Sequence, residues 1–333
     1  MKKPLALLLH DAINAESRPD ETDVLVQVEQ VSAALKANGW RTAVTAATGD
    51  LKSLQWAITG RAPRLVVNLV ESLDGDGQRI HVVPELLEKM GLPFTGSSSD
   101  ALRLTSQKPL AKQRMRDNGI ATPRDPGTAA DVADRNRRYI VKSVWEHASL
   151  GLDDTSVVTG RDAARRKIAR CQKKYGGEWF AEEYIDGREF NISLLEVDGK
   201  PQVLPIPEIT FVDYPENKPK IVGYAAKWDP AAVEYDATRR DFPALPKAQR
   251  RTLIDCAKRC WQLFALRGYA RVDIRLATDG TPYVLEINAN PCLAQDSGFV
   301  VSALAAGMAY HELIERIVAA AVPLPQEIQR RAG

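Results

Sequence analysis

The chain of 333 residues lacks long apolar runs and has almost no excess of charge of either sign. No segment approaches the roughly 20 consecutive apolar residues that a membrane-spanning helix needs. Lysine and arginine total 45 and aspartate and glutamate total 43, so the formal net charge is +2. This balance predicts no nucleic-acid partner and no membrane surface as a target. The composition, 44% hydrophobic, is typical of a globular protein with two or three domains.

Cysteine is also scarce: four residues, at positions 171, 256, 260 and 292, show neither disulfide nor metal-site spacing. Free thiols favour a reducing, cytoplasmic location. The beginning of the chain, MKKPLALLLHD, has two lysines before an apolar run, as a secretory signal does. The run ends at His10, short of the roughly 7–15 apolar residues that such a signal needs. We therefore expect residues 5–9 to form a buried strand of a cytoplasmic protein.

The first hundred residues alternate between strand and helix patterns. Residues 5–10 and 64–72 are typical of buried strands, and residues 21–38 have helical apolar spacing that ends at Gly39. Residues 82–90 predict another helix. This alternation predicts an α/β fold with an open parallel sheet, in which ligands bind at the ends of the strands.

The rest of the chain mixes helices and strands and shows no internal repeat. A proline-rich breaker at 121–127 is a candidate domain boundary, a second irregular stretch covers 205–246, and a polar tail ends the chain. The patterns predict helices over 99–118, 161–175, 247–266 and 299–321, and strands over 139–145 and 178–204.

The most informative stretch is 269–291, which predicts a β-hairpin that brings carboxylates face to face. Asp279-Gly280 lies between two β-rich runs and favours a two-residue loop, with Thr278 paired to Thr281. That register places Asp273 opposite Glu286. Two facing carboxylates repel at a cost of about 0.2–1 kcal/mol. A magnesium ion between them would turn the pair into a binding site, because this ion prefers oxygen ligands.

Alternation along the strands sorts the hairpin into two faces. Arg271, Asp273 and Arg275 share the polar face, with Glu286 and Asn288 across from them. The opposite face is apolar and is expected in the core; it consists of Val272, Ile274, Leu285 and Ile287. The alternative to a metal site is a solvated polar face on which the two arginines neutralise the acids.

Three lysines and one acid-rich strand are further candidates. Lys142 ends a predicted strand, where a lysine either extends to solvent or binds an anion. The segment 181–192 places Glu189 on a polar face, which would either accept hydrogen bonds from ribose hydroxyls or be solvated. Lys227 and Lys108 carry little information when each is taken alone.

Taken in order, these segments resemble the ATP-grasp superfamily, and more closely D-alanine–D-alanine ligase and its relatives. The resemblance covers most of the chain from residue 64 onward. It rests on LLEKMGLPFTGSSSDALRLTSQK (86–108), ATP (121–123), VKS (141–143), EEYIDGREF (182–190), AKW (226–228), ARVDIR (270–275) and LEINANP (285–291). It implies an ATP-grasp fold, α/β in class, with three subdomains over residues 1–98, 99–190 and 191–333.

The resemblance implies nucleotide contact for Lys108, Lys142, Glu182, Glu183, Tyr184, Ile185, Glu189 and Lys227. Lys142 would lie at the phosphates and Lys227 at the terminal phosphates. Glu182 would face the adenine, the backbone of 183–185 would form the adenine hinge, and Glu189 would hold the ribose.

The resemblance also implies a metal and a reaction. Asp273, Glu286 and Asn288 would hold Mg²⁺, or Mn²⁺, against the ATP phosphates. Arg271 and Lys227 would be catalytic, with Arg271 stabilising charge on the reacting centre. A carboxylate would attack the γ-phosphorus of ATP, and an amine would displace phosphate from the acyl phosphate to give an amide. The expected partners are a small acid, a small amine and a second copy of the chain in a homodimer.

Departures from the family pattern fall in the substrate pockets. HDAINAESRPDE (10–21) replaces a glycine-rich start, and only Ser149 remains of a serine pair in the phosphate-covering loop at 146–151. Cys292 replaces a glycine whose backbone helps to hold the reacting oxyanion, or simply fills space. Ser297 aligns roughly with a serine that binds the carboxylate of the second substrate. We therefore expect a different acid, a different amine, or both.

Two other functions stay open. An ATP-grasp enzyme of different chemistry would phosphorylate or carboxylate a small molecule. A nucleotide-binding module without turnover would act in regulation or interaction. The retained lysines, acids and Arg271 favour a working ligase over the module.

Overall fold

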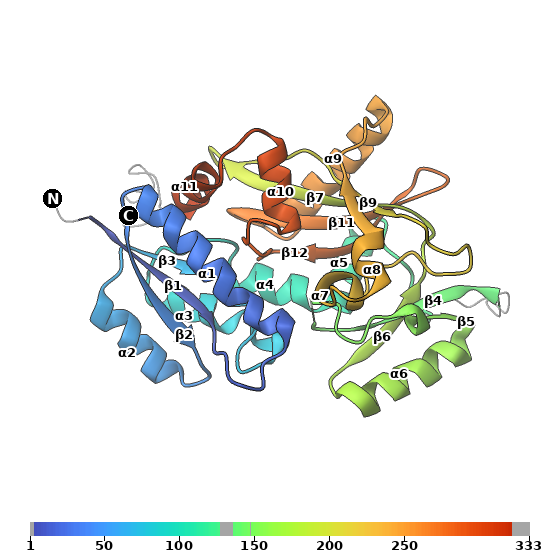
Figure 1. Ribbon diagram of the computed structural model, residues 1–333, viewed down its shortest axis with the longest axis horizontal. Helices are drawn as coiled ribbons and strands as arrows, with labels where there is room; N and C mark the ends of the chain where they lie inside the picture. Colours follow the sequence, from blue (N-terminus) through green and yellow to red (C-terminus); the bar gives the residue numbers. More distant parts are fainter. Residues whose placement is uncertain (1–2, 127–135, 147, 322–333) are drawn as a thin grey trace.

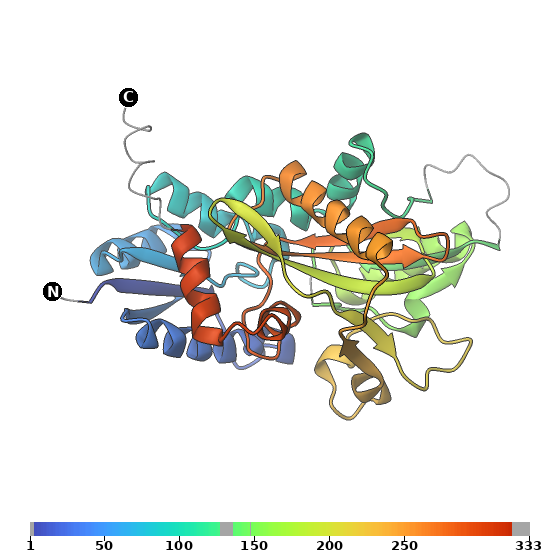
Figure 2. The ribbon, with the colours of Figure 1, turned by 90° about the horizontal axis from the view of Figure 1, so that it is seen from above.

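The computed structural model describes residues 3–126, 136–146 and 148–321. It contains three sheets that follow one another along the chain. An N-terminal lobe and a small sheet lie at opposite ends of the long axis, and a large sheet lies between them (Figures 1 and 2). The predicted breaker at 121–127 is described only to residue 126, and the polar tail after residue 321 lies outside the described residues. Within the described ranges, no helix has both the length and the apolarity needed to cross a membrane.

The N-terminal lobe confirms the predicted parallel sheet, whose strand order is β2-β1-β3. The second strand and the helix after it were missed, because β2 lies at an edge of the sheet and alternates exposed and half-buried residues. The elements are β1 (Leu5–Asp11), α1 (Pro19–Ala37), β2 (Arg41–Ala47), α2 (Leu51–Arg61), β3 (Leu65–Asn68), a 3₁₀ turn (Gly77–Arg79) and α3 (Val82–Lys89).

Two long helices predicted from the sequence are each broken in two. The helix expected over 99–118 is α4 (Ser99–Ser106) followed by α5 (Lys108–Asp117). Pro109 causes the break, since proline lacks the amide hydrogen and clashes with the preceding turn. The helix expected over 299–321 is α10 (Gly298–Ala305) followed by α11 (Tyr310–Ala321), and Gly307 between them has a left-handed φ of 80°.

The small antiparallel sheet has the strand order β5-β4-β6. One face is covered by helix α6, whose position and length agree with the predicted helix over 161–175. The elements are β4 (Arg138–Ser143), a 3₁₀ turn (Asp154–Ser156), β5 (Val157–Thr159), α6 (Arg161–Tyr175) and β6 (Trp179–Glu183).

The large antiparallel sheet has the order β10-β9-β7-β11-β12, with β8 beside β7. Part of the stretch expected to be irregular, 205–246, is ordered as β9, α7, α8 and β10. The elements are β7 (Gly187–Val197), β8 (Lys200–Val203), β9 (Glu208–Phe211), α7 (Ala225–Trp228), α8 (Val233–Ala237), β10 (Thr238–Asp241), α9 (Lys247–Leu263), β11 (Tyr269–Ala277) and β12 (Pro282–Asn288).

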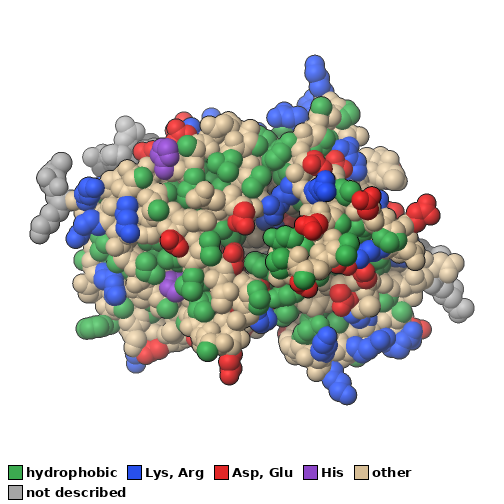
Figure 3. All heavy atoms as spheres, viewed as in Figure 1, with side chains coloured by type: hydrophobic (Ala, Val, Ile, Leu, Met, Phe, Trp, Pro, Cys, Tyr) green, Lys and Arg blue, Asp and Glu red, His purple; other side chains and the backbone are tan. Residues whose placement is uncertain are grey.

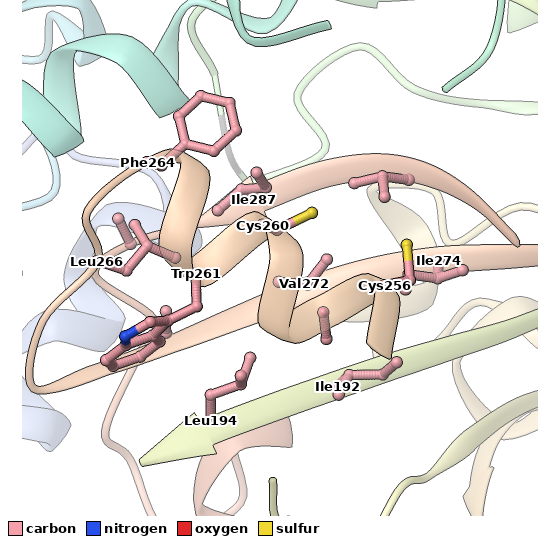
Figure 4. Packing of buried hydrophobic residues seen from close by; sticks show 14 of the residues in the cluster. Ile192, Leu194, Cys256, Cys260, Trp261, Phe264, Leu266, Val272, Ile274 and Ile287 are labelled. Carbon is pink, nitrogen blue, oxygen red and sulfur yellow. The ribbon is translucent and has the colours of Figure 1, made fainter. Parts of the chain in front are cut away.

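Helix α9 covers one face of the large sheet and forms the main core with it. Cys256 and Cys260 lie one turn apart and pack toward Ile274 and Val272, beside Trp261 (Figure 4). Both thiols are buried, so these cysteines are core residues, as their spacing predicted. Helix α9 covers the apolar face of the large sheet. The polar side chains of the same sheet therefore lie on the opposite face, which is turned toward the other two sheets.

The hairpin of β11 and β12 pairs Asp273 with Glu286 and Arg271 with Asn288, as predicted. The predicted loop is wrong, however: Ala277 and Thr281 close a loop of three residues, with Gly280 at a φ of 84°. A β-bulge between Asp273 and Ile274 absorbs the difference.

Leu285 is the extra residue of this bulge, because Ile274 pairs with Val284 while Asp273 pairs with Glu286. Val284 therefore occupies the core position predicted for Leu285. Leu285 itself is half-buried and points away from the core.

Candidate active site

A cleft of about 1010 Å³ lies where the three sheets meet. Figure 3 shows acidic and basic side chains gathered around a hollow in the middle of the molecule. The cleft brings together every site residue named from the sequence: Lys108, Lys142, Glu182, Glu183, Tyr184, Ile185, Glu189, Lys227, Arg271, Asp273, Glu286, Asn288, Cys292 and Ser297. Residues from 108 to 297 thus converge on one cavity.

The acidic pair on the hairpin lies at the floor of this cleft. Asp273 accepts two hydrogen bonds from Arg271, at 2.8 and 2.9 Å, and one from Asn191 Nδ2, at 2.8 Å. Burial raises the pKa of the Asp273 carboxyl, and the adjacent Arg271 guanidinium opposes that rise. The neutralising contact expected of Arg271 is therefore present.

The donor set of the hairpin fits a magnesium ion. Asp273 and Glu286 offer two carboxylates and Asn288 one amide oxygen, all lining the same cavity. Magnesium is usually held by one or two carboxylates, with phosphate and water completing its shell. In the described ranges no group of three or more histidine, cysteine or acidic residues forms a closed metal cage. An open two-carboxylate site agrees with that finding.

In the alternative to a metal site, Arg275 would neutralise the hairpin acids, but it binds Glu189 and the predicted hinge instead. Its Nη2 lies 2.8 Å from Glu189 Oε2, and its Nη1 donates to the carbonyl of Ile185 at 2.9 Å. A third bond from Nη2 reaches the carbonyl of Lys220. Arg275 and Glu189 are both buried, so this ion pair fixes the strand that carries Glu189 against the hinge.

The three predicted lysines reach the cleft from three different elements. Lys108 begins α5 and its Nζ donates to the carbonyl of Glu146 at 2.6 Å; burial lowers its pKa. Lys227 lies on α7, and burial lowers its pKa as well. Lys142 lies 2.9 Å from Glu182 Oε1. Burial favours the neutral amine of Lys142, yet nearby carboxylates, Glu182 foremost, raise its pKa overall.

Lys112 was missed by the sequence reasoning. It is a residue of α5 with a buried side chain, and its Nζ lies 2.7 Å from Glu182 Oε2. Burial lowers the pKa of Lys112 to about 8, although Glu182 opposes this shift. A signal was present, because Lys112 lies four residues after Lys108 and therefore on the same face of the helix.

The acid Glu71, which follows β3, was also missed as a site residue. It lines the end of the cleft where the substrates were expected, near Asp11 and Asp23. Burial, followed by the charges of these two aspartates, raises the pKa of Glu71 to about 8. This end of the cleft therefore holds more carboxyl groups than the sequence resemblance implied.

Cys292 and Ser297 lie at the same end. Burial, and next the negative charge of Glu71, raises the pKa of the Cys292 thiol, so the thiolate form is disfavoured. Ser297 Oγ donates to the carbonyl of Cys292 at 2.7 Å and accepts from the amide of Val300, which makes it the N-cap of α10. The environment of Cys292 favours the space-filling interpretation over a reactive one.

Two loops close over the cleft and hold each other. Ser149 Oγ donates to the carbonyl of Val222 at 3.1 Å, and Trp228 Nε1 donates to the carbonyl of Ala148 at 3.1 Å. Ser149, in the loop predicted to cover the phosphates, thus faces the segment that carries Lys227. Residue 147 of that loop lies outside the described residues.

Comparison with known proteins identifies the family. The model of the family described as D-ala D-ala ligase C-terminus matches residues 130–319. The chain is 35% identical over 263 residues to the uncharacterized protein y4sG of Sinorhizobium fredii, covering 78% of this chain and 74% of that protein. It is 30% identical over 242 residues to the D-alanine–D-alanine ligase of Cupriavidus metallidurans, covering 71% and 70%.

Solved structures agree in fold. A D-alanine–D-alanine ligase from Bacillus anthracis superposes with a TM-score of 0.74 at 21% identity, covering 99% of this chain and 100% of that one. The same ligase complexed with ATP gives a TM-score of 0.73 at 20% identity, with the same coverage. The chain belongs to the D-alanine–D-alanine ligase family, and it is an ATP-dependent carbon–nitrogen ligase with the ATP-grasp fold.

Proposed function

We propose that the protein joins a small amino-acid-like carboxylate to a small amine, with release of ADP and phosphate. The observation that carries this proposal is the convergence of one complete charge set in a single cleft. Three lysines, two metal-type carboxylates and Arg271 meet there, from segments far apart in sequence. A cluster that mixes ammonium groups with carboxylates suits a magnesium–triphosphate better than it suits either ion alone.

In this proposal the nucleotide lies between the small and the large sheet. Lys142 and Lys227 bind its phosphates, and Lys108 supports them from the start of α5. The backbone of 183–185 forms the adenine hinge, with Glu182 beside it, and Glu189 accepts the ribose hydroxyls. Arg275 supports this arrangement because it already fixes Glu189 and the hinge to each other.

Asp273, Glu286 and Asn288 hold the metal, Mg²⁺ or Mn²⁺, which neutralises phosphate charge when it is bound. Arg271 is the catalytic cation of the large sheet. Its guanidinium lies at the boundary between the metal residues and the substrate end, where charge develops as the carboxylate is phosphorylated and then attacked. Since Arg271 already holds Asp273, it is positioned before substrates arrive.

The substrates bind at the end of the cleft lined by Glu71, Cys292 and Ser297. Carboxyl groups on that wall suit the ammonium group of an amino acid. The amine that attacks must be neutral. The ionised form of the half-buried Glu71, whose raised pKa makes it a stronger base than an ordinary carboxylate, is suited to accept a proton from an ammonium at that point. Because the wall departs from the family pattern, we propose that the acid, the amine or both differ from D-alanine.

The chain would be organised in three subdomains over residues 1–98, 99–190 and 191–333, of which the last extends beyond the described residues. The N-terminal and small sheets fall within the first two of these ranges, and the large sheet begins with β7 at Gly187, four residues before the third range. We also propose a cytoplasmic location, supported by four free cysteines, and a homodimer, supported only by the family resemblance.

Turnover of ATP against a panel of amino acids and amines tests the proposal. The expected result is ADP formation that requires both an acid and an amine, with a product mass equal to the two substrates minus water. A phosphorylated or carboxylated product would show the alternative ATP-grasp chemistry. ATP binding without turnover across the panel would favour the nucleotide-binding module.

A further inference from the structure

Lys112 lies at the junction of three parts of the molecule. From helix α5 its Nζ reaches Glu182 near the end of β6, Leu285 on β12 and Thr122 in the segment that follows α5. The distances are 2.7 Å to Glu182 Oε2, 2.6 Å to the Leu285 carbonyl and 3.1 Å to Thr122 Oγ1. The side chain of Lys112 is 4% exposed, so it cannot itself reach a ligand in the cleft.

The contact with Leu285 fixes the bulge of the metal hairpin. A bulge leaves backbone groups outside the ladder, and a buried carbonyl without a donor is costly. Lys112 supplies that donor for Leu285, and Thr122 Oγ1 donates to the preceding carbonyl, of Val284, at 2.7 Å. The residue after Leu285 is Glu286. The two donors therefore hold the backbone that sets Glu286 opposite Asp273.

Through Glu182, Lys112 shares one carboxylate with Lys142. Glu182 is buried and lies between two ammonium groups, with Lys112 on Oε2 and Lys142 on Oε1. Two lysines and one carboxylate leave one positive charge in excess. Lys112 is buried, whereas the side chain of Lys142 is 18% exposed and lines the cleft. The excess charge is thus available at Lys142.

We propose that Lys112 is a positioning residue for the magnesium–ATP complex, acting on Lys142 through Glu182 and on Glu286 through the Leu285 bulge. With Lys112 present, Glu182 keeps a counter-ion when Lys142 turns to a phosphate. Without Lys112, Lys142 is the only cation on a buried carboxylate, and moving it would leave that charge unpaired. The inference rests on the proposed roles of Lys142 and Glu286.

Calorimetric binding of ATP, with and without magnesium, tests this role without knowledge of the substrates. Lys112→Met keeps the length of the side chain and removes its charge. We expect it to weaken magnesium–ATP binding roughly 10–100-fold, the range typical of residues that orient metal ligands. Lys112→Arg, which keeps the charge, should bind more tightly than Lys112→Met. Lys89→Met, on the exposed face of α3, should bind as the wild type does.

Two further variants separate the effect of Lys112 on Glu286 from its effect on Lys142. Thr122→Val removes the donor to the Val284 carbonyl and one contact of Lys112, but leaves the pair of Lys112 with Glu182 in place. It should raise the magnesium concentration needed for ATP binding and weaken metal-free ATP binding less than Lys112→Met does. Adding Glu182→Gln to Lys112→Met should restore part of the ATP affinity, since Lys142 then has no carboxylate to hold it. If Lys112→Met does not fold, the effect through the hairpin remains measurable in Thr122→Val, and an unchanged magnesium dependence in that variant would overturn this part of the inference.

ATP binding by the wild type distinguishes failure of this inference from failure of the proposed function. If the wild type binds magnesium–ATP and a folded Lys112→Met binds it equally well, with only a lower melting temperature, Lys112 is structural and the inference is overturned. If the wild type does not bind magnesium–ATP, the proposed function itself fails, and this inference fails with it.

Discussion

Tyr224 donates a 2.8 Å hydrogen bond to Asp20, which lies 204 positions earlier in the chain. The bond connects the segment that carries Lys227 to the start of α1, across the mouth of the cleft. Asp20 is nearly buried at its side chain and also pairs with Arg18. Burial, followed by the hydrogen bond to Asp20, raises the pKa of Tyr224 to about 12, so the phenol remains a donor throughout the neutral range.

Removing that hydroxyl tests whether the contact holds the cleft closed. For Tyr224→Phe we expect a rise in the KM of the substrates of roughly 2–10-fold, equivalent to the loss of one hydrogen bond. Steady-state kinetics measure it, and Tyr175→Phe, on the exposed side of α6, is the matched control. An unchanged KM would mean that the contact has no part in substrate binding.

Replacing Arg271 should reduce turnover more than it reduces nucleotide binding. Arg271→Ala is expected to reduce kcat by about 10²–10³-fold, as the loss of one charge-stabilising donor does in other enzymes. It should leave metal-free ATP binding nearly intact, because the lysines of the cleft are untouched, whereas magnesium-dependent binding also loses the contact of Arg271 with Asp273. Rates of ADP release and calorimetric ATP binding measure the two effects, and Arg251→Ala on the exposed face of α9 is the control. Equal loss of both would assign Arg271 to nucleotide binding.

Glu71 should make the stability of the protein depend on pH. Its pKa is raised to about 8 in the folded protein, above its ordinary value of 4.5. Between these values the folded state binds more protons than the unfolded state, so stability falls as pH rises through this window. Glu71→Gln removes the dependence. We expect its melting temperature to exceed that of the wild type at pH 8.5 and to approach it at pH 5; a parallel offset at both pH values would refute the assignment.

The buried pair of Arg275 and Glu189 should matter more for stability than any surface pair. Arg275→Met leaves Glu189 buried without its partner and should cost about 3–5 kcal/mol of unfolding free energy. Arg188→Met, which breaks the exposed pair with Glu208, should cost about 0–1 kcal/mol. Urea unfolding measures both variants. Similar losses in the two would show that Arg275 is already solvated.

Local patterns predicted much of the structure because they are set by near neighbours. The strand pattern of 269–291 predicted that Asp273 faces Glu286, and the helical spacing of 161–175 predicted α6. The break between α4 and α5 is local as well, because Pro109 in the first turn of α5 marks it in the sequence. Edge strand β2 was not predicted, because its half-exposed side chains form no apolar run.

Long-range contacts could not be predicted in this way. The ion pair of Lys112 with Glu182 joins a helix to a strand 70 residues later, and no periodicity links the two. The bond of Tyr224 to Asp20 depends on how whole lobes pack. The family resemblance assigned roles to residues that face the ligand, but it said nothing of the buried groups that support them.

The bulge at Leu285 has a consequence for the tolerance of the hairpin to change. It separates the ladder near the loop from the ladder around Asp273 and Glu286, and each part has its own register. Lys112 and Thr122 anchor the backbone at the boundary between the two parts. Lengthening or shortening the loop at residues 278–280 would therefore shift only the outer part of the hairpin. The geometry of the proposed metal residues is therefore independent of the length of the exposed loop of their own hairpin.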